Sequence, residues 1–79
     1  MRILDETNDQ PLKRVTIFLT PDEADSMVTQ LNALISKERL HHIHIEDESF
    51  QREITLAIYK QSNISKFDQR SRMLIDEDK

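Results

Sequence analysis

The run Thr20-Pro21-Asp22-Glu23 is the strongest structural signal in this 79-residue chain, because it marks where a helix begins. A threonine at such a position can accept a hydrogen bond from the backbone, and a glutamate three residues later can accept one in return. Proline fits the first helical position, where its missing N–H needs no partner. The run therefore predicts a helix from residue 21 onward.

The residues that follow have the spacing of an amphipathic helix. Apolar side chains recur at steps of three and four residues, which places them along one face. They are Ala24, Met27, Val28, Leu31, Leu34 and Ile35. Lys37 and Arg39 suit the C-terminal end, where the helix dipole favours cations.

Three other segments alternate apolar and polar side chains as strands do. They span residues 12–19, 40–46 and 52–60. The short acidic link at residues 47–49 predicts that the second and third segments form an antiparallel hairpin. A second helix should follow, with Ser62 or Asn63 as its cap. Its inner side would carry Ile64, Phe67, Ser71 and Leu74.

These elements predict an α+β fold in the order β-α-β-β-α. The third strand is richest in β-branched and apolar residues, so we place it in the middle of a three-stranded antiparallel sheet of order 1-3-2. Two helices would cover one face of this sheet, as in a ferredoxin-like unit that lacks its last strand. The competing order pairs the first two strands in parallel through a right-handed crossover.

The length suits one small α+β domain, residues 1–79. A domain of this size buries only about 60% of the surface that its unfolded chain exposes, so we expect self-association to add to its stability. Residues 1–10 are polar after the first few positions and predict a loose N-terminal arm or a short edge strand. Residues 76–79 predict a frayed tail.

Composition excludes several classes of function. The chain has no glycine, so the usual dinucleotide and phosphate-binding loops are excluded and no cofactor is expected. Its net charge is −4, and no basic stripe with aromatics indicates a nucleic-acid binder. No apolar run approaches the roughly 20 residues of a membrane span, and no signal peptide is recognisable. With no cysteine, we expect a cytoplasmic protein.

His42 and His44 are the clearest candidates for chemistry. Two residues apart on a strand, they project from one face about 6.6 Å apart, a spacing at which imidazoles can share a zinc ion. Glu46 could be a third ligand, and Glu53 should lie on the same face of the next strand. Without a cysteine or a second histidine cluster, we predict no metal site. A metal-binding or pH-sensing module built on the two histidines is the alternative.

Strand parity also predicts an open sheet face. The interface that we predict there consists of Phe18, His42, His44, Glu46 and Tyr59. We expect a homodimer formed through this face or through an adjacent strand edge. No catalytic residue is predicted, because the acidic residues at 46–48 suit a solvated loop and no serine has the glycine context of a nucleophile elbow.

Three runs carry a resemblance to a known group of proteins. Residues 19–24 (LTPDEA), 42–45 (HIHI) and 53–58 (EITLAI) resemble small bacterial proteins in which a threonine-proline-acidic helix start precedes an H-x-H strand. Some of these are immunity proteins of polymorphic toxin systems, and many are uncharacterised. The resemblance covers about half of the chain and transfers no binding residue.

The resemblance implies a bacterial, non-enzymatic protein-binding domain. An immunity or inhibitor protein would set its acidic surface against a basic toxin, since opposite charge favours fast and specific association. An accessory regulatory subunit is a further alternative.

Overall fold

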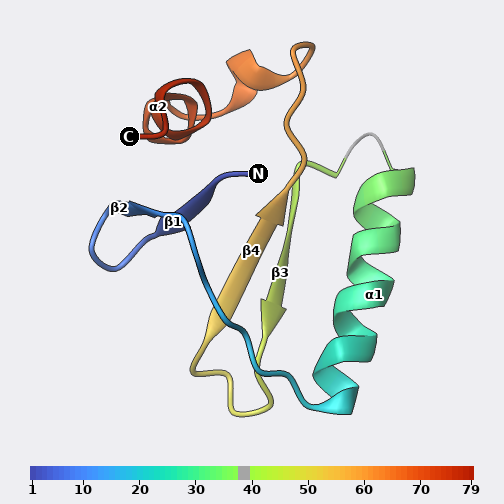
Figure 1. Cartoon of the computed structure of the whole chain (residues 1–79). Helices are drawn as coiled ribbons and strands as arrows, with labels where there is room; N and C mark the ends of the chain where they lie inside the picture. The colour runs from blue at the N-terminus through green and yellow to red at the C-terminus, as the bar shows by residue number, and fades with distance from the viewer. Residues whose placement is uncertain (38–39) are drawn as a thin grey trace. The chain divides into compact units, whose positions relative to one another are not determined.

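The computed structural model describes residues 1–37 and 40–79 (Figure 1). Its elements are β1 (Ile3–Asp5), β2 (Gln10–Leu12), α1 (Pro21–Ser36), β3 (His42–Glu46), β4 (Glu53–Ala57), the short 3-10 helix η1 (Ile64–Lys66) and α2 (Gln69–Glu77). They divide into two compact units. The terminal unit comprises Met1–Ile17 and Tyr59–Lys79, and the central unit comprises Phe18–Ile58.

The described residues form an α+β fold with two α-helices, but the predicted three-stranded sheet is wrong. The described strands form two separate antiparallel pairs, β1-β2 and β3-β4. Residues 12–19, predicted as the first strand, contain only the last residue of β2 and otherwise no regular structure. Every one of these residues is exposed, so their alternation buries no apolar face, and strand preference depends on such packing. Both predicted strand orders needed this segment.

The terminal unit contains the β1–β2 hairpin, in which Leu4 pairs with Pro11. Residues 1–10, which suggested a loose arm or a short edge strand, hold β1, the turn and the start of β2. The Asp5 carboxylate accepts hydrogen bonds from the backbone of Thr7 and Asn8 and from the Asn8 side chain. Chiefly the Asn8 bonds lower the pKa of Asp5. Asp9 takes the left-handed conformation that a glycine would otherwise supply.

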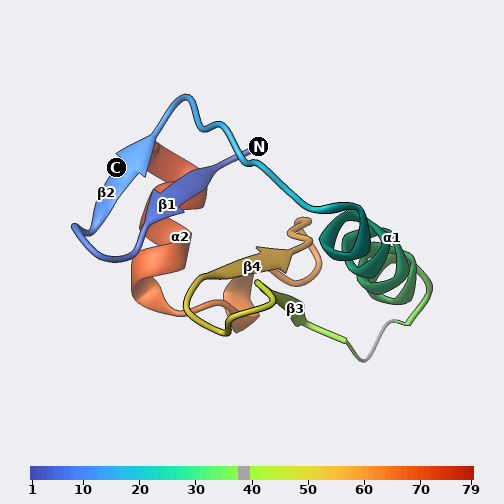
Figure 2. The same ribbon diagram turned by 90° about the horizontal axis from the view of Figure 1, so that it is seen from below.

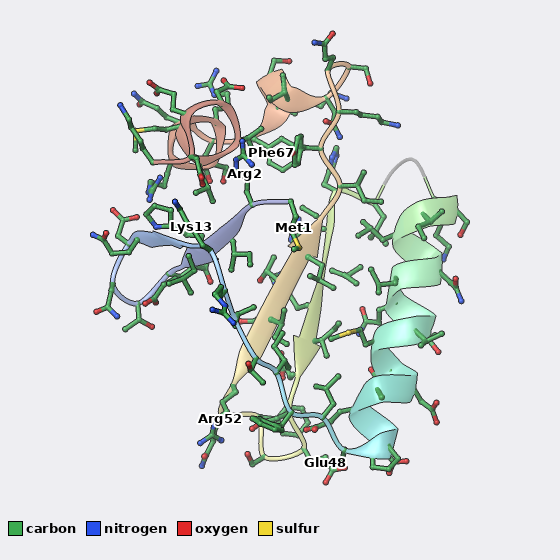
Figure 3. The ribbon with its side chains drawn as sticks, viewed as in Figure 1. Met1, Arg2, Lys13, Glu48, Arg52 and Phe67 are labelled. Carbon is green, nitrogen blue, oxygen red and sulfur yellow. The ribbon has the colours of Figure 1, made fainter. Side chains whose placement is uncertain are left out.

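Helix α2 lies beside this hairpin in both views (Figure 2). Arg2 Nε donates to the carbonyl oxygen of Leu74 at 3.1 Å, and Arg70 Nε lies 2.6 Å from Asp9 Oδ1. Figure 3 shows the Arg2 side chain directed toward Phe67, which lies just before α2. Two long-range arginine contacts therefore tie the helix to the hairpin.

The start of α2 differs from the prediction. Asn63 precedes η1 without capping it by a side-chain bond, and the α-helix begins only at residue 69. Asp68 is its cap, accepting from Ser71 N at 2.7 Å, because a short acidic side chain satisfies a free N–H of the first turn. The pKa of Asp68 is lowered chiefly by this bond. The tail expected at 76–79 holds the end of α2 and the left-handed cap residue Asp78.

In the central unit, α1 begins as predicted. Thr20 Oγ1 accepts from Glu23 N at 3.2 Å, and Glu23 Oε1 accepts from Thr20 N at 2.9 Å. The helix packs against β3, and the core there consists of Leu34, Ile43 and Ile45, with Met27, Leu31, Ile54 and Leu56 partly buried around it. Two apolar residues of the predicted stripe, Val28 and Ile35, are exposed instead. The predicted Arg39 contribution to the helix end lies outside the described residues.

Replacing Thr20 with alanine should lower the free energy of unfolding by about 1 kcal/mol, as loss of a helix cap does. Besides capping α1, the hydroxyl donates to Glu48 Oε1 at 3.2 Å. A urea titration followed by helical circular dichroism measures the loss. Thr29→Ala, at an exposed position within α1, is the matched control and should cost nothing. A Thr20→Ala midpoint equal to wild type would contradict the capping role.

Candidate functional site

The β3–β4 hairpin sorts its side chains by parity as predicted. In β3, Ile43 and Ile45 are only 5% and 3% exposed, whereas the residues between and beside them face solvent. In β4, Ile54 and Leu56 are half-buried, and their neighbours are exposed. We call the solvent-facing side of the hairpin the outer face. It carries His42, His44, Glu46, Glu53, Thr55 and Ala57.

His44 is the best-connected side chain on the outer face. Its Nδ1 lies 2.6 Å from Glu53 Oε1 and 2.9 Å from Thr55 Oγ1. The register places Thr55 directly opposite His44. The rings of His42 and His44 meet edge to face with centroids 4.8 Å apart. Sequence spacing correctly predicted that the two histidines share a face with Glu53 and Thr55 of the next strand, and the structure adds the contacts of His44 with both.

Two carboxylates also meet on this face. Glu46 and Glu53 are register partners, and like charges directly opposite each other destabilise a strand pair. A protonated His44 imidazole, which contacts Glu53, would offset the repulsion between the two carboxylates. No lysine or arginine belongs to the outer face. The end of the hairpin near the turn is therefore locally acidic.

Asp47 organises the turn between the two strands. Its Oδ1 accepts from Gln51 N at 2.8 Å and Arg52 N at 3.1 Å, while its Oδ2 accepts from the Ser49 hydroxyl and the Arg52 guanidinium. These bonds, led by that from the Arg52 backbone, lower the pKa of Asp47 to about 2. The carboxylate predicted to sit in a solvated acidic loop is thus a structural anchor.

A second carboxylate joins this turn to α1. Glu23 Oε2 accepts from Glu48 N at 3.1 Å, and Figure 3 shows Glu48 beside the first turn of the helix. Hydrogen bonds from the backbone of Thr20 and then of Glu48 lower the pKa of Glu23. The carboxylates of Asp47 and Glu23 are thus engaged in hydrogen bonds within the turn and the helix start. Glu46 and Glu53 are the acidic residues that belong to the outer face.

The two aromatic residues of the predicted interface lie elsewhere in the chain. Phe18 is 91% exposed and precedes α1 in a segment without regular structure, so the strand parity that assigned it to the sheet face does not apply. Tyr59 belongs to the terminal unit. His42, His44 and Glu46 are the members that one strand brings together.

Phe50 is a feature that sequence reasoning missed. It lies in the β3–β4 turn with φ of 56°, and its side chain is 79% exposed. A left-handed conformation is unusual for a bulky residue. The sequence does hint at such a residue: with no glycine in the chain, any left-handed position in a turn must be taken by another residue.

Metal and membrane signals are absent from the described residues. In residues 1–37 and 40–79, no group of three or more histidine, cysteine or acidic side chains is placed to hold a metal ion. None of the helices in this described part is long and apolar enough to cross a membrane.

No protein-family model, curated protein or solved structure matches the chain. The resemblance to immunity proteins therefore stays a prediction from the sequence.

Proposed function

We propose that this chain is a non-enzymatic protein-binding module that works as a homodimer. The observation that carries the proposal is the central sheet, which within residues 1–37 and 40–79 has only the two strands β3 and β4. Within the central unit, α1 packs mainly over β3 on one side of that sheet, and three of the described residues form the buried core. A two-stranded hairpin is marginal in water and gains stability from added strands or packing. Association with a second copy would supply what so small a core does not.

A basic protein is the partner that we propose for the outer face. Glu46 and Glu53 oppose each other there, no lysine or arginine belongs to that face, and the whole chain carries a net charge of −4. An arginine or lysine from a partner would relieve the repulsion between the two carboxylates. An immunity or inhibitor role in a bacterial cytoplasm fits this chemistry, because charge complementarity speeds and selects association.

Sedimentation of the wild-type protein across micromolar concentrations tests the homodimer. We expect the mass of two chains, and a melting temperature that rises with protein concentration, because dissociation accompanies unfolding of a dimer. A protein that sediments as a monomer throughout, with a melting temperature independent of concentration, would refute self-association.

A further inference from the structure

We propose that the dimer forms by antiparallel pairing of β4 with β4 of a second copy, which joins two hairpins into one four-stranded sheet. The inference rests on the proposed self-association and specifies its contact. Three features of β4 support this contact. Backbone groups along its free edge lack partners among the described residues, its residue order favours one register, and its inner side chains are only half-buried.

The outer edge of β4 carries unpaired backbone groups. Asp47 N donates to Arg52 O at 3.0 Å, which makes these two residues a hydrogen-bonded pair. Such pairs alternate along an antiparallel ladder, so the N–H and C=O groups of three β4 residues point away from β3. They belong to Glu53, Thr55 and Ala57. Among the described strands, β4 pairs only with β3, and these groups make no other backbone hydrogen bond in the described chain.

The opposite edge of the sheet is partly occupied. By the same alternation, the carbonyl of His44 points away from β4. Gln30 of α1 reaches it, and Gln30 Nε2 donates to His44 O at 3.1 Å. The helix also packs its apolar side against β3. Of the two edges, that of β4 is therefore the one available for strand addition.

The order of residues along β4 selects one register for a symmetric pair. A two-fold axis at Thr55 places Thr55 opposite its own copy and Glu53 opposite Ala57 of the second copy. All three edge residues are then paired, with about six backbone hydrogen bonds between the chains. An axis at Glu53 would instead oppose two carboxylates, which is unfavourable. An axis at Ile54 would leave Ala57 unpaired.

The inner side of β4 is complementary in the same register. Ile54 and Leu56 are only half-buried, in contrast with Ile43 and Ile45 of β3, because α1 packs mainly over β3. With the axis at Thr55, Ile54 lies opposite Leu56 of the second copy, and the reverse pair follows by symmetry. The apolar cores of the two copies would then join into one layer. A second copy of this chain is therefore the partner that fits the β4 edge.

Charge at position 55 tests the axis. Thr55→Lys and Thr55→Glu each place like charges opposite each other, so each variant alone should raise the dimer Kd at least about tenfold. An equimolar mixture of the two should restore a dimer, since lysine then faces glutamate. Sedimentation reads the mass, and circular dichroism checks that each variant is folded. Thr29→Lys, at an exposed position of α1, is the control and should stay dimeric.

Disulfide trapping tests the register, because the chain has no cysteine of its own. Paired residues of the hydrogen-bonded kind have Cα atoms about 5.5 Å apart, within the range that a disulfide spans. Thr55→Cys should therefore cross-link to itself under mild oxidation. Glu53→Cys should not, but it should cross-link when mixed with Ala57→Cys.

These experiments distinguish an error in the β4 contact from an error in the proposed homodimer. If wild type is dimeric but the Thr55 charge variants stay dimeric and Thr55→Cys does not cross-link, the β4 contact is overturned while self-association stands. Loss of the dimer in Phe18→Asp, with the Thr55 variants unaffected, would likewise move the contact to the interface predicted from the sequence. A wild-type monomer would remove the proposed homodimer itself.

Discussion

Replacing Ile45 with alanine is expected to lower the free energy of unfolding by about 2–5 kcal/mol, the cost of emptying a buried aliphatic site. Ile45 is 3% exposed and packs with Leu34 and Ile43 in the core under α1. Alanine also has a lower strand preference than isoleucine. A domain of 79 residues has a total stability of roughly 4–12 kcal/mol. The substitution should therefore remove a large share of the stability and lower the urea midpoint well below that of wild type, as followed by helical circular dichroism.

Ile35→Ala is the matched control for this measurement. The same atoms are removed, but Ile35 is 70% exposed on α1, and exposed substitutions change stability by no more than about 0.5 kcal/mol. Alanine also favours the helix. Both variants and wild type should be compared at one protein concentration, because self-association would shift the midpoint. Equal urea midpoints for Ile45→Ala and wild type would show that the β3–α1 core is not what holds the central unit together.

The start of α1 and the parity of β3 were predictable from sequence because each is decided locally. A capping box needs only residues that are three apart, and it forms here between Thr20 and Glu23. The alternation of residues 42–46 likewise sends Ile43 and Ile45 inward and the histidines outward. In both cases a short stretch of chain contains all the information that its own conformation requires.

Sheet membership was not predictable from the same patterns. Residues 14–19 alternate as clearly as residues 42–46 do, yet they form no strand. Alternation determines which side chains would share a face if the segment were a strand. A strand forms only if it also has a neighbouring strand to pair with and a core that buries one of its faces. The short pairing between β1 and β2 had no strong alternation to reveal it.

The candidate site was predictable only in part, since its neighbours come from cross-strand register. The histidine pair could be read from spacing, but the contacts of His44 with Glu53 and Thr55 depend on how β3 and β4 align. The number of residues in the turn sets that alignment. With no glycine available, the turn relies on Asp47 and on the left-handed Phe50. The sequence alone showed an acidic link there, but it did not indicate that Asp47 closes the turn through hydrogen bonds.

Asp47→Asn is expected to destabilise the central unit at neutral pH and to become harmless in acid. The carboxylate accepts four hydrogen bonds that close the β3–β4 turn, and bonds to a charged acceptor are the stronger kind. An asparagine keeps the shape of the side chain but has one acceptor oxygen and no charge. The register of β4, and the edge that it presents, would lose their main anchor at the turn.

The pH dependence distinguishes this role from a general loss of packing. The pKa of Asp47 is lowered from 3.8 to about 2 in the folded protein, so its charge stabilises the fold above about pH 4, and this stabilisation is lost as the pH falls to about 2. The difference in urea midpoint between wild type and Asp47→Asn should therefore shrink over that interval. Asp5 and Asp68 also have lowered pKa values, but both proteins contain them and Asp47 is not among the causes of either shift, so they cancel in the difference. Glu23 does not cancel fully, because the Asp47 charge acts to raise its pKa. Glu23→Gln and the double variant Glu23→Gln, Asp47→Asn are therefore compared as a second pair that lacks this coupling. Glu6→Gln, at an exposed turn position, should match wild type throughout. A midpoint difference that stays constant down to about pH 2 would show that Asp47 acts through its shape and not through its charge.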